Sequence, residues 1–262
     1  MRVAIVGGGK MGEAILSRLL ATSPEDEVSV VEVDPARRDY LAARYRIPVH
    51  ATPPADAADV VVLAVKPQDA AAAYRSLGTL RPDQVLLSIL AGVRISSIRE
   101  GTGHSAVVRA MPNTPAAIGE GFTVWTATPE VAEPAREQVR SVLASLGRER
   151  YVTDEAYLDM ATAVNGSGPA FVYLFIEALC DAAVAIGLPR AMAHDLVLQT
   201  VRGAAAYVEA TGAHPAQLKN DVTSPAGTTA AGLYQLERHA LRAAIQDAIA
   251  AAYRRSQELG NA

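Results

Sequence analysis

Short runs of valine, isoleucine and leucine alternate with helix-like stretches along the first half of the chain. Near-continuous apolar runs fall at residues 2–6, 28–33, 59–65, 85–90 and 106–109. Runs without a polar face are typical of strands in a parallel sheet that helices cover on both sides. Helix candidates lie between or after these runs, at 11–21, 36–44, 68–77 and 130–146. The alternation predicts an α/β fold with a doubly wound parallel sheet.

The pattern changes near Tyr151, and no convincing strand follows Val152. Helices are predicted over about 154–164, 169–187, 190–210 and 229–259, the last with an apolar stripe along it. We therefore divide the chain into an α/β domain, residues 1–152, and an all-α domain, residues 153–262. The predicted helices carry more apolar surface than one thin layer of helices can bury against itself. We expect a homodimer, or a higher oligomer built from dimers.

Composition and charge exclude several classes of function. Half of the residues are hydrophobic and a fifth are charged. The net charge is -4, and the chain contains only three lysines. We expect no nucleic-acid partner and no membrane partner, because the chain has no basic run and no uninterrupted apolar run of spanning length. The single Cys180 and the scattered histidines support no metal site. His104 lies in a glycine-rich loop and is expected to be exposed. A soluble, cytoplasmic protein is predicted.

A glycine motif follows the first predicted strand and begins the first helix. Gly7, Gly9 and Gly12 form the pattern G-x-G-x-x-G. In this context the glycines allow a tight turn, a close approach of backbone to a pyrophosphate, and close packing of helix on strand. The structural alternative is a glycine-rich turn that binds nothing. We favour a dinucleotide site of the Rossmann type, with the pyrophosphate on the backbone of Gly7, Gly9, Lys10, Met11 and Gly12.

Two further segments bear on the cofactor. Glu32 ends the second predicted strand, where an acid would bind the ribose 2′-hydroxyl of NAD, but Arg37 and Arg38 follow and could hold the 2′-phosphate of NADP. The second segment lies at the end of another predicted strand and consists of Ala64, Val65, Lys66 and Pro67. Ligands bind at strand ends in open α/β sheets, so we expect this segment to line the ribose and nicotinamide. Lys66 could equally be an ordinary surface lysine.

The loop at residues 222–233 is rich in hydroxyl groups and enters the last predicted helix. Ser224, Thr228 and Thr229 stand around Pro225, Ala226 and Gly227. Free amides at a helix start can bind a carboxylate without an arginine. The alternative is ordinary helix capping, which Ser and Thr favour. Three hydroxyls are more than one cap requires.

Taken together, these motifs resemble those of the pyrroline-5-carboxylate reductase family over essentially the whole chain. The segments that carry the resemblance are the glycine motif and residues 64–67, 91–98, 109–115, 166–170 and 222–233. The resemblance implies reduction of 1-pyrroline-5-carboxylate to L-proline by NAD(P)H, the last step of proline biosynthesis, and it favours NADP (NADPH) over NAD (NADH). One departure is Ala226, which stands where the family motif commonly has glycine.

The same resemblance assigns the site residues. Thr229 would be catalytic, with its hydroxyl on the ring nitrogen of the substrate. Ser224, Gly227 and Thr228 would bind the substrate carboxylate, and Asn113 would lie in the loop beside the nicotinamide.

Three alternatives to this interpretation differ in their chemistry. A β-hydroxyacid dehydrogenase needs a lysine on the helix after a glycine turn, and the predicted helix after Gly168 contains none. A reductase of a related cyclic imine acid, with a six-membered ring or from specialised metabolism, remains open because of Ala226. A catalytically silent dinucleotide-binding regulator would not need the hydroxyl-rich loop.

Overall fold

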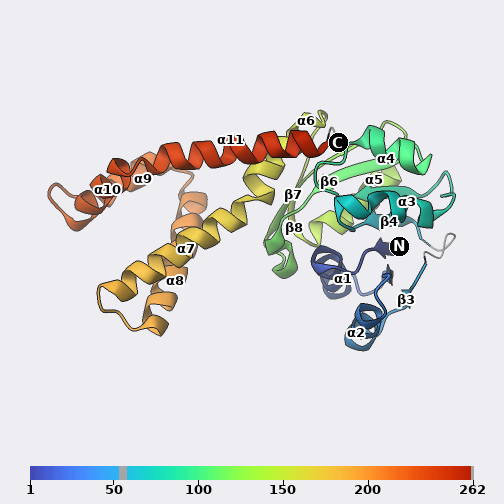
Figure 1. Cartoon of the computed structure of the whole chain (residues 1–262), viewed down its shortest axis with the longest axis horizontal. Coiled ribbons are helices and arrows are strands. Elements are labelled where there is room, and N and C mark those ends of the chain that lie inside the picture. The colour runs from blue at the N-terminus through green and yellow to red at the C-terminus, as the bar shows by residue number, and fades with distance from the viewer. Residues whose placement is uncertain (53–57, 261–262) are drawn as a thin grey trace. The chain divides into compact units, whose positions relative to one another are not determined.

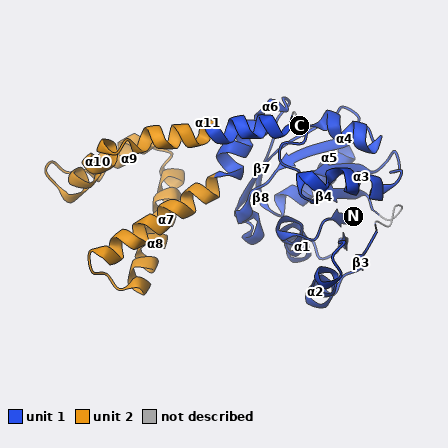
Figure 2. Ribbon diagram, viewed as in Figure 1, with its two compact units in different colours: residues 1–167, 251–262 blue, residues 168–250 orange. Residues whose placement is uncertain are grey.

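The computed structural model describes residues 1–52 and 58–260, which form two compact units (Figure 2). The first unit contains Met1–Ser167 together with the end of the chain from Ala251. The second contains Gly168–Ala250. The last helix thus begins in the second unit and ends in the first.

Within the described residues, one sheet of eight strands forms the centre of the first unit (Figure 1). The strands are β1 (Arg2–Val6), β2 (Glu27–Val31), β3 (Val49–His50), β4 (Val60–Leu63), β5 (Val85–Ser88), β6 (Val107–Met111), β7 (Gly121–Ala127) and β8 (Gly147–Tyr151). Their order is β3-β2-β1-β4-β5-β6-β7-β8, and all neighbours are parallel except β6 and β7. The first six strands have the order of a Rossmann fold, which confirms the predicted fold class.

Alternation along β1 explains why helices cover both faces of the sheet. Val3 and Ile5 belong to the core layer under α1, α2 and α5, whereas Ala4 and Val6 belong to the layer under α3 and α4. These helices are α1 (Lys10–Thr22), α2 (Pro35–Tyr45), α3 (Ala70–Leu77), α4 (Ile95–Thr102) and α5 (Glu133–Ala144). Burial of apolar side chains in two separate layers stabilises the doubly wound arrangement. Two short helices, η1 (Pro67–Asp69) and η2 (Thr114–Ile118), follow β4 and β6.

Several elements of this unit are absent from the sequence prediction. The short β3, the helix α4 and the strands β7 and β8 were not predicted. Strand β8 has the sequence Gly-Arg-Glu-Arg-Tyr and is half-exposed at the edge of the sheet, so it lacks the apolar signal of a buried strand. The expected exposure of His104 is wrong. This side chain is buried, and its Nε2 lies 2.9 Å from the carbonyl oxygen of Gln84.

The first unit also contains the start of the helical half and the end of α11. Helix α6 (Ala156–Ala161) continues into a π-helix (Thr162–Gly166). Its N-cap is Glu155 and not Asp154, although Asp154 accepts a hydrogen bond from Ala156 N–H at the helix start. At the other end of the chain, Leu259 packs so closely on Gly92 that a β-carbon there would lie 2.6 Å from Leu259 Cβ. Gly92 has a φ of +76°, so glycine is required there for space and for backbone conformation.

Helices α7 (Gly168–Ala185), α8 (Arg190–Thr211), α9 (Pro215–Asp221) and α10 (Thr228–Arg238) make up most of the second unit, with the start of α11 (Leu241–Gly260). The prediction of one continuous helix over 229–259 is wrong. The chain breaks at Ala240, whose φ is +54°, and Ala240 N–H donates to Glu237 O. The apolar stripe continues across this break without a glycine or proline, which is why periodicity did not reveal it.

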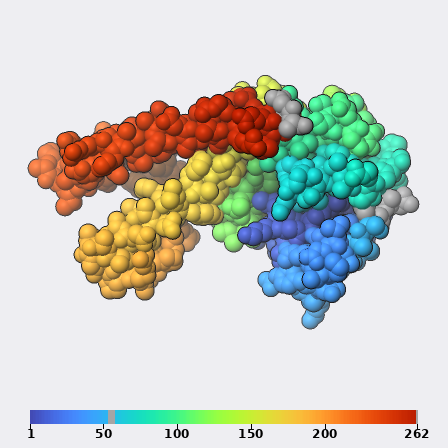
Figure 3. All heavy atoms as spheres, viewed as in Figure 1, coloured from blue at the N-terminus to red at the C-terminus, as the bar shows by residue number. Residues whose placement is uncertain are grey.

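Apolar side chains of α7 lie on the surface of its unit, where Figure 3 shows this helix in yellow. Phe171, Val172, Tyr173, Leu174 and Phe175 are all exposed. By length and composition alone the stretch Ala156–Ala185 could cross a membrane, and only 6% of its apolar 18-residue window is buried. Exposed apolar helices of this kind are also typical of faces that a partner chain covers.

Candidate functional site

The glycine motif lies at the switch point of the sheet, between the carboxyl ends of β1 and β4. Gly7 has a φ of +106°, and a β-carbon on it would lie 2.7 Å from Ala64 O. A β-carbon on Gly12 would lie 1.9 Å from Gly7 O, so these two positions require glycine. A β-carbon on Gly9 would have no described neighbour within 4 Å, so the backbone there is open to a ligand. The three glycines therefore have the geometry that a pyrophosphate at a helix N-terminus requires.

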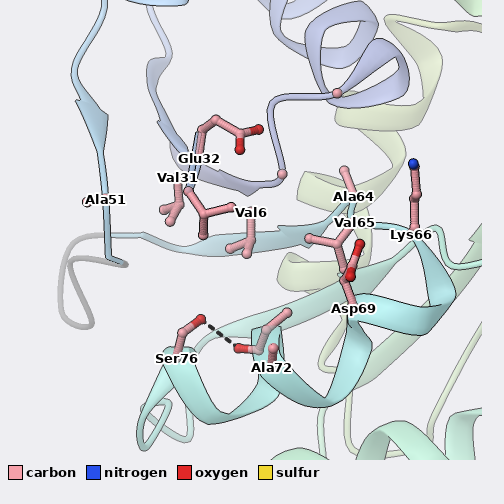
Figure 4. Close-up of a pocket in the computed structure, with 14 residues that line it drawn as sticks. Val6, Val31, Glu32, Ala51, Ala64, Val65, Lys66, Asp69, Ala72 and Ser76 are labelled. Atoms are coloured by element: carbon pink, nitrogen blue, oxygen red, sulfur yellow. Dashed lines mark hydrogen bonds between the residues drawn. The ribbon is translucent and has the colours of Figure 1, made fainter. Parts of the chain in front are cut away.

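A cavity of about 390 Å³ opens beside this loop (Figure 4). Its lining includes Gly7 and Gly9 of the loop, Glu32 after β2 and Lys66 after β4, all of which the sequence analysis selected. Ala64 and Val65 also line it, as predicted, and helix α3 contributes small side chains such as Ala72. A mostly apolar cleft with a few charged groups at a switch point is the usual form of a cofactor site.

Other predicted cofactor residues lie outside the lining of this cavity. Lys10 and Met11 form the first turn of α1, next to Gly12, and Pro67 begins η1. Arg37 and Asn113 have their side chains bonded to other parts of the protein, as described next. Their contribution to cofactor binding stays a prediction.

The side chain of Arg37 binds the glycine loop itself. Its Nε donates to Gly8 O at 2.7 Å, and its Nη2 is paired with Glu13. Burial tends to raise the pKa of Glu13, but hydrogen bonds from Arg37 and Tyr45 outweigh it, so the pKa is lowered. Arg38 donates to the carbonyl oxygens of Glu32 and Val33, at 2.9 and 2.8 Å. Both arginines thus have protein partners.

Asn113 joins its loop to the π-helix. Its Nδ2 donates to Asn165 Oδ1 at 2.8 Å, and its Oδ1 accepts from Phe122 N–H at 3.0 Å. Asn165 in turn donates to Phe122 O at 2.7 Å. Gly166 is packed against the end of Met111, since a β-carbon on it would lie 2.6 Å from Met111 Cε. The predicted loop and the π-helix therefore meet through the side-chain amides of Asn113 and Asn165.

A buried arginine that sequence reasoning did not single out ties α6 and the end of α11 to the sheet. Arg109 of β6 is 2% exposed and donates to Glu155 at 2.8 Å and to Asp159 at 2.9 Å. Ser256 of α11 donates to the same oxygen of Asp159 at 3.1 Å. An arginine directly after apolar strand residues was the available signal, since buried charge requires a partner.

The hydroxyl-rich loop of the second unit closes as a tight turn before α10. Gly227 N–H donates to Ser224 O at 3.0 Å, and Ala226 has a φ of +57°. Gly227 is the N-cap of α10, and no side chain of the described residues caps this helix. The N-cap position of α10 is therefore taken by a glycine and not by Ser224, Thr228 or Thr229. The first amides of α10 point toward the loop with the positive end of the helix dipole.

Within residues 1–52 and 58–260, no group of three His, Cys, Asp or Glu side chains is arranged to hold a metal ion. Cys180 is buried and forms no disulfide.

A Rossmann-ordered sheet whose glycine motif opens on a switch-point cavity defines a dinucleotide-binding protein. Residues 2–92 match the family model "NADP oxidoreductase coenzyme F420-dependent", and residues 155–259 match "Pyrroline-5-carboxylate reductase dimerisation". The pyrroline-5-carboxylate reductase of Synechocystis is 46% identical over 99% of this chain and 98% of its own.

Solved structures agree with these matches. The pyrroline carboxylate reductase of Plasmodium falciparum with NADP bound superposes with a TM-score of 0.90 at 30% identity, over 99% of this chain and 98% of that one. The 1-pyrroline-5-carboxylate reductase of Streptococcus pyogenes gives 0.91 at 31% identity, over 98% of each chain. The chain belongs to the pyrroline-5-carboxylate reductase family, and it is an NAD(P)-dependent oxidoreductase.

Proposed function

We propose that this protein reduces 1-pyrroline-5-carboxylate to L-proline with NAD(P)H, the last step of proline biosynthesis. The observation that carries the proposal is full-length similarity to reductases of this name, at 46% identity for the relative from Synechocystis. The geometry of the glycine loop supports it independently, because the residues that would hold the dinucleotide have the required space and backbone conformation.

The first unit would hold the cofactor. The backbone at Gly7, Gly9, Lys10, Met11 and Gly12 would bind the pyrophosphate, with open space at Gly9 in support. Residues Ala64–Pro67, at the end of β4, and Asn113 would line the ribose and nicotinamide. When bound, the reduced nicotinamide supplies a hydride to the imine carbon. The protein's task is mainly to orient the reactants at near-contact distance, since a protonated imine is already electrophilic.

Some observations favour NADPH as the cofactor and others favour NADH. The sequence prediction of NADP rests on Arg37, Arg38 and the family, and the relative from Plasmodium was solved with NADP bound. Against NADPH, the guanidinium groups of Arg37 and Arg38 already donate to backbone carbonyl oxygens. The contacts around Gly8 favour NADH, because they hold the carboxylate of Glu32 in the wall of the cavity.

The loop before α10 would hold the substrate. The substrate carboxylate would lie at Gly227 and Thr228, with help from Ser224. Gly227 N–H already donates to Ser224 O, so the amide of Thr228 is the donor offered first. The hydroxyl of Thr229 would hydrogen-bond the ring nitrogen, orient the ring and relay a proton. Supporting this, α10 begins with a glycine N-cap and no side-chain cap among the described residues. Such a helix start leaves its amides available to an anion.

The helical half would form a homodimer, or an oligomer built from dimers. The match to a dimerisation model and the exposed apolar side chains of α7 support this proposal. A second copy covering Phe171, Leu174 and Phe175 would remove a large apolar surface from water. A cytoplasmic location remains a prediction.

A rate comparison tests the proposed function. The purified protein is mixed with NADPH or NADH and either 1-pyrroline-5-carboxylate or its six-membered-ring analogue, and loss of nicotinamide absorbance is followed. We expect the five-membered ring to react fastest. Faster reduction of the six-membered ring would favour the related-imine alternative, and no oxidation with either ring would favour a silent regulator.

A further inference from the structure

The peptide groups of Gly8, in the middle of the glycine motif, are held from both sides by charged side chains. Gly8 N–H donates to Glu32 Oε2 at 2.9 Å, and Gly8 O accepts from Arg37 Nε at 2.7 Å. A β-carbon on Gly8 would lie 2.5 Å from Leu41 Cδ1, so the residue is also confined against α2. Glu32 and Arg37 therefore fix the conformation of this part of the loop.

The carboxylate of Glu32 is immobilised in the wall of the cavity. Its second oxygen, Oε1, accepts from Asp34 N–H at 3.0 Å, so both oxygens are bonded to backbone. Figure 4 shows this carboxylate beside the glycine loop, with Lys66 on the far side of the cavity. Lys66 follows β4 and Glu32 follows β2, with β1 between these strands, and the two side chains form no ion pair with each other.

The two nearby arginines are held in other interactions. Besides Gly8, Arg37 is paired with Glu13, and its guanidinium lies 4.8 Å from the ring centre of Tyr40. Glu13 also accepts from Tyr45 at 2.8 Å. Arg38 donates through one nitrogen to the carbonyls of Glu32 and Val33. Arg37 uses its Nε for Gly8 and an Nη2 hydrogen for Glu13, so these two of its five N–H donors are already engaged by the protein.

The end of β2 is where the adenosine ribose lies in this fold. A fixed carboxylate can accept a hydrogen bond from a ribose 2′-hydroxyl, whereas a 2′-phosphate carries a charge of about −1.5 to −2 at pH 7 and is repelled. We propose that the chain takes NADH in preference to NADPH, that Glu32 sets this preference, and that Arg37 is a positioning residue for the loop. This rests on the proposed function only in requiring a dinucleotide at the glycine motif.

Calorimetric titration with two cofactor fragments, ADP-ribose and its 2′-phosphate, tests the preference without turnover. We expect ADP-ribose to bind at least about tenfold more tightly, which corresponds to about 1.4 kcal/mol. Glu32→Gln should bring the two dissociation constants within about threefold of each other. Asp39→Asn removes the same charge from an exposed position on α2 and should leave the ratio unchanged. Tighter or equal binding of the 2′-phosphate by the unaltered chain, or no effect of Glu32→Gln, would overturn the proposal.

Arg37→Ala separates a positioning role from phosphate binding. If Arg37 positions the loop, this variant weakens both fragments about equally and moves their ratio less than about twofold. Selective loss of binding to the 2′-phosphate would identify Arg37 as a phosphate ligand and contradict the proposal. Arg37→Lys replaces it if circular dichroism shows that the alanine variant is unfolded. Should the fragments bind as expected while 1-pyrroline-5-carboxylate is not reduced, the proposed function fails and the cofactor preference stands.

Discussion

Gly227 N–H donates to the carbonyl oxygen of Ser224 at 3.0 Å, and this bond closes a four-residue turn. Pro225 is its second residue, and Ala226, with a φ of +57°, is its third. A type II turn places proline and a residue of positive φ at these two positions. The departure from the family motif noted in the sequence, alanine in place of glycine, thus falls at the position where the backbone favours glycine.

Ala226→Gly is expected to stabilise the protein. An L-residue in the left-handed region costs about 1–2 kcal/mol, and the added freedom of glycine in the unfolded chain offsets about 0.4–1 kcal/mol of this. A net gain of about 0.5–1 kcal/mol should appear in urea unfolding. Ala230→Gly, inside α10, is the matched control and should destabilise by about 1 kcal/mol. Similar losses for both variants would show that Ala226 is not strained.

Thr229→Ala is expected to lower turnover by about 10²-fold, the typical effect of removing one positioned donor. Binding of dinucleotide should hardly change, because the glycine motif belongs to the other unit. Thr229→Ser keeps the hydroxyl and should retain most activity. Steady-state rates and cofactor titration measure the two effects. The control is Thr223→Val, which should leave turnover nearly unchanged, because the hydroxyl of Thr223 already donates to Lys219 O at 2.6 Å. Full activity in Thr229→Ala would refute the proposed role.

Arg109→Met is expected to destabilise the protein by about 3–5 kcal/mol, because it leaves the buried Asp159 without its cation. Arg99→Met breaks an exposed pair with Glu130 at 3.3 Å and should cost about 0–1 kcal/mol. Denaturant unfolding of the two variants measures the difference. Equal losses of unfolding free energy in the two variants would mean that the buried ion pairs of Arg109 stabilise the fold no more than an exposed pair does.

The stabilisation that Glu13 provides should depend on pH. Its folded-state pKa lies below the ordinary value of about 4.3, so its contribution is complete above that value and is lost as the pH falls through the folded pKa. The difference in unfolding free energy between the unaltered chain and Glu13→Gln should be constant near neutrality and shrink below about pH 4. A difference that grows toward acid pH would reverse the assigned direction.

Much of the first unit could be predicted from the sequence, because buried parallel strands are continuous apolar runs. Val60–Leu63 and Val85–Ser88 illustrate this. The edge strand Gly147–Tyr151 could not be predicted, since its three central residues are charged: Arg148 and Arg150 are exposed, and Glu149 is half-buried. The break at Ala240 was also hidden, because a single left-handed residue interrupts a helix without changing its apolar stripe.

At the candidate site, the spacing of glycines along the sequence revealed the glycine motif. It did not reveal the hydrogen bonds that other side chains make to this loop. Gly8 was an unconstrained position of the motif, yet Glu32 and Arg37 bind its two backbone groups. Which way an arginine turns depends on tertiary contacts such as those with Glu13 and Tyr40, and these are not encoded in spacing. Two arginines after an acid suggested a phosphate site, and spacing did not indicate that Arg37 also donates to Gly8 O.

The most direct test of the proposed function follows the hydride itself. The protein is incubated with 1-pyrroline-5-carboxylate and NADH carrying two deuterium atoms at nicotinamide C4, and the product is analysed by mass spectrometry and NMR. We expect L-proline with one deuterium on the carbon that was doubly bonded to nitrogen. Formation of no proline, or of proline without deuterium at that carbon, would contradict it.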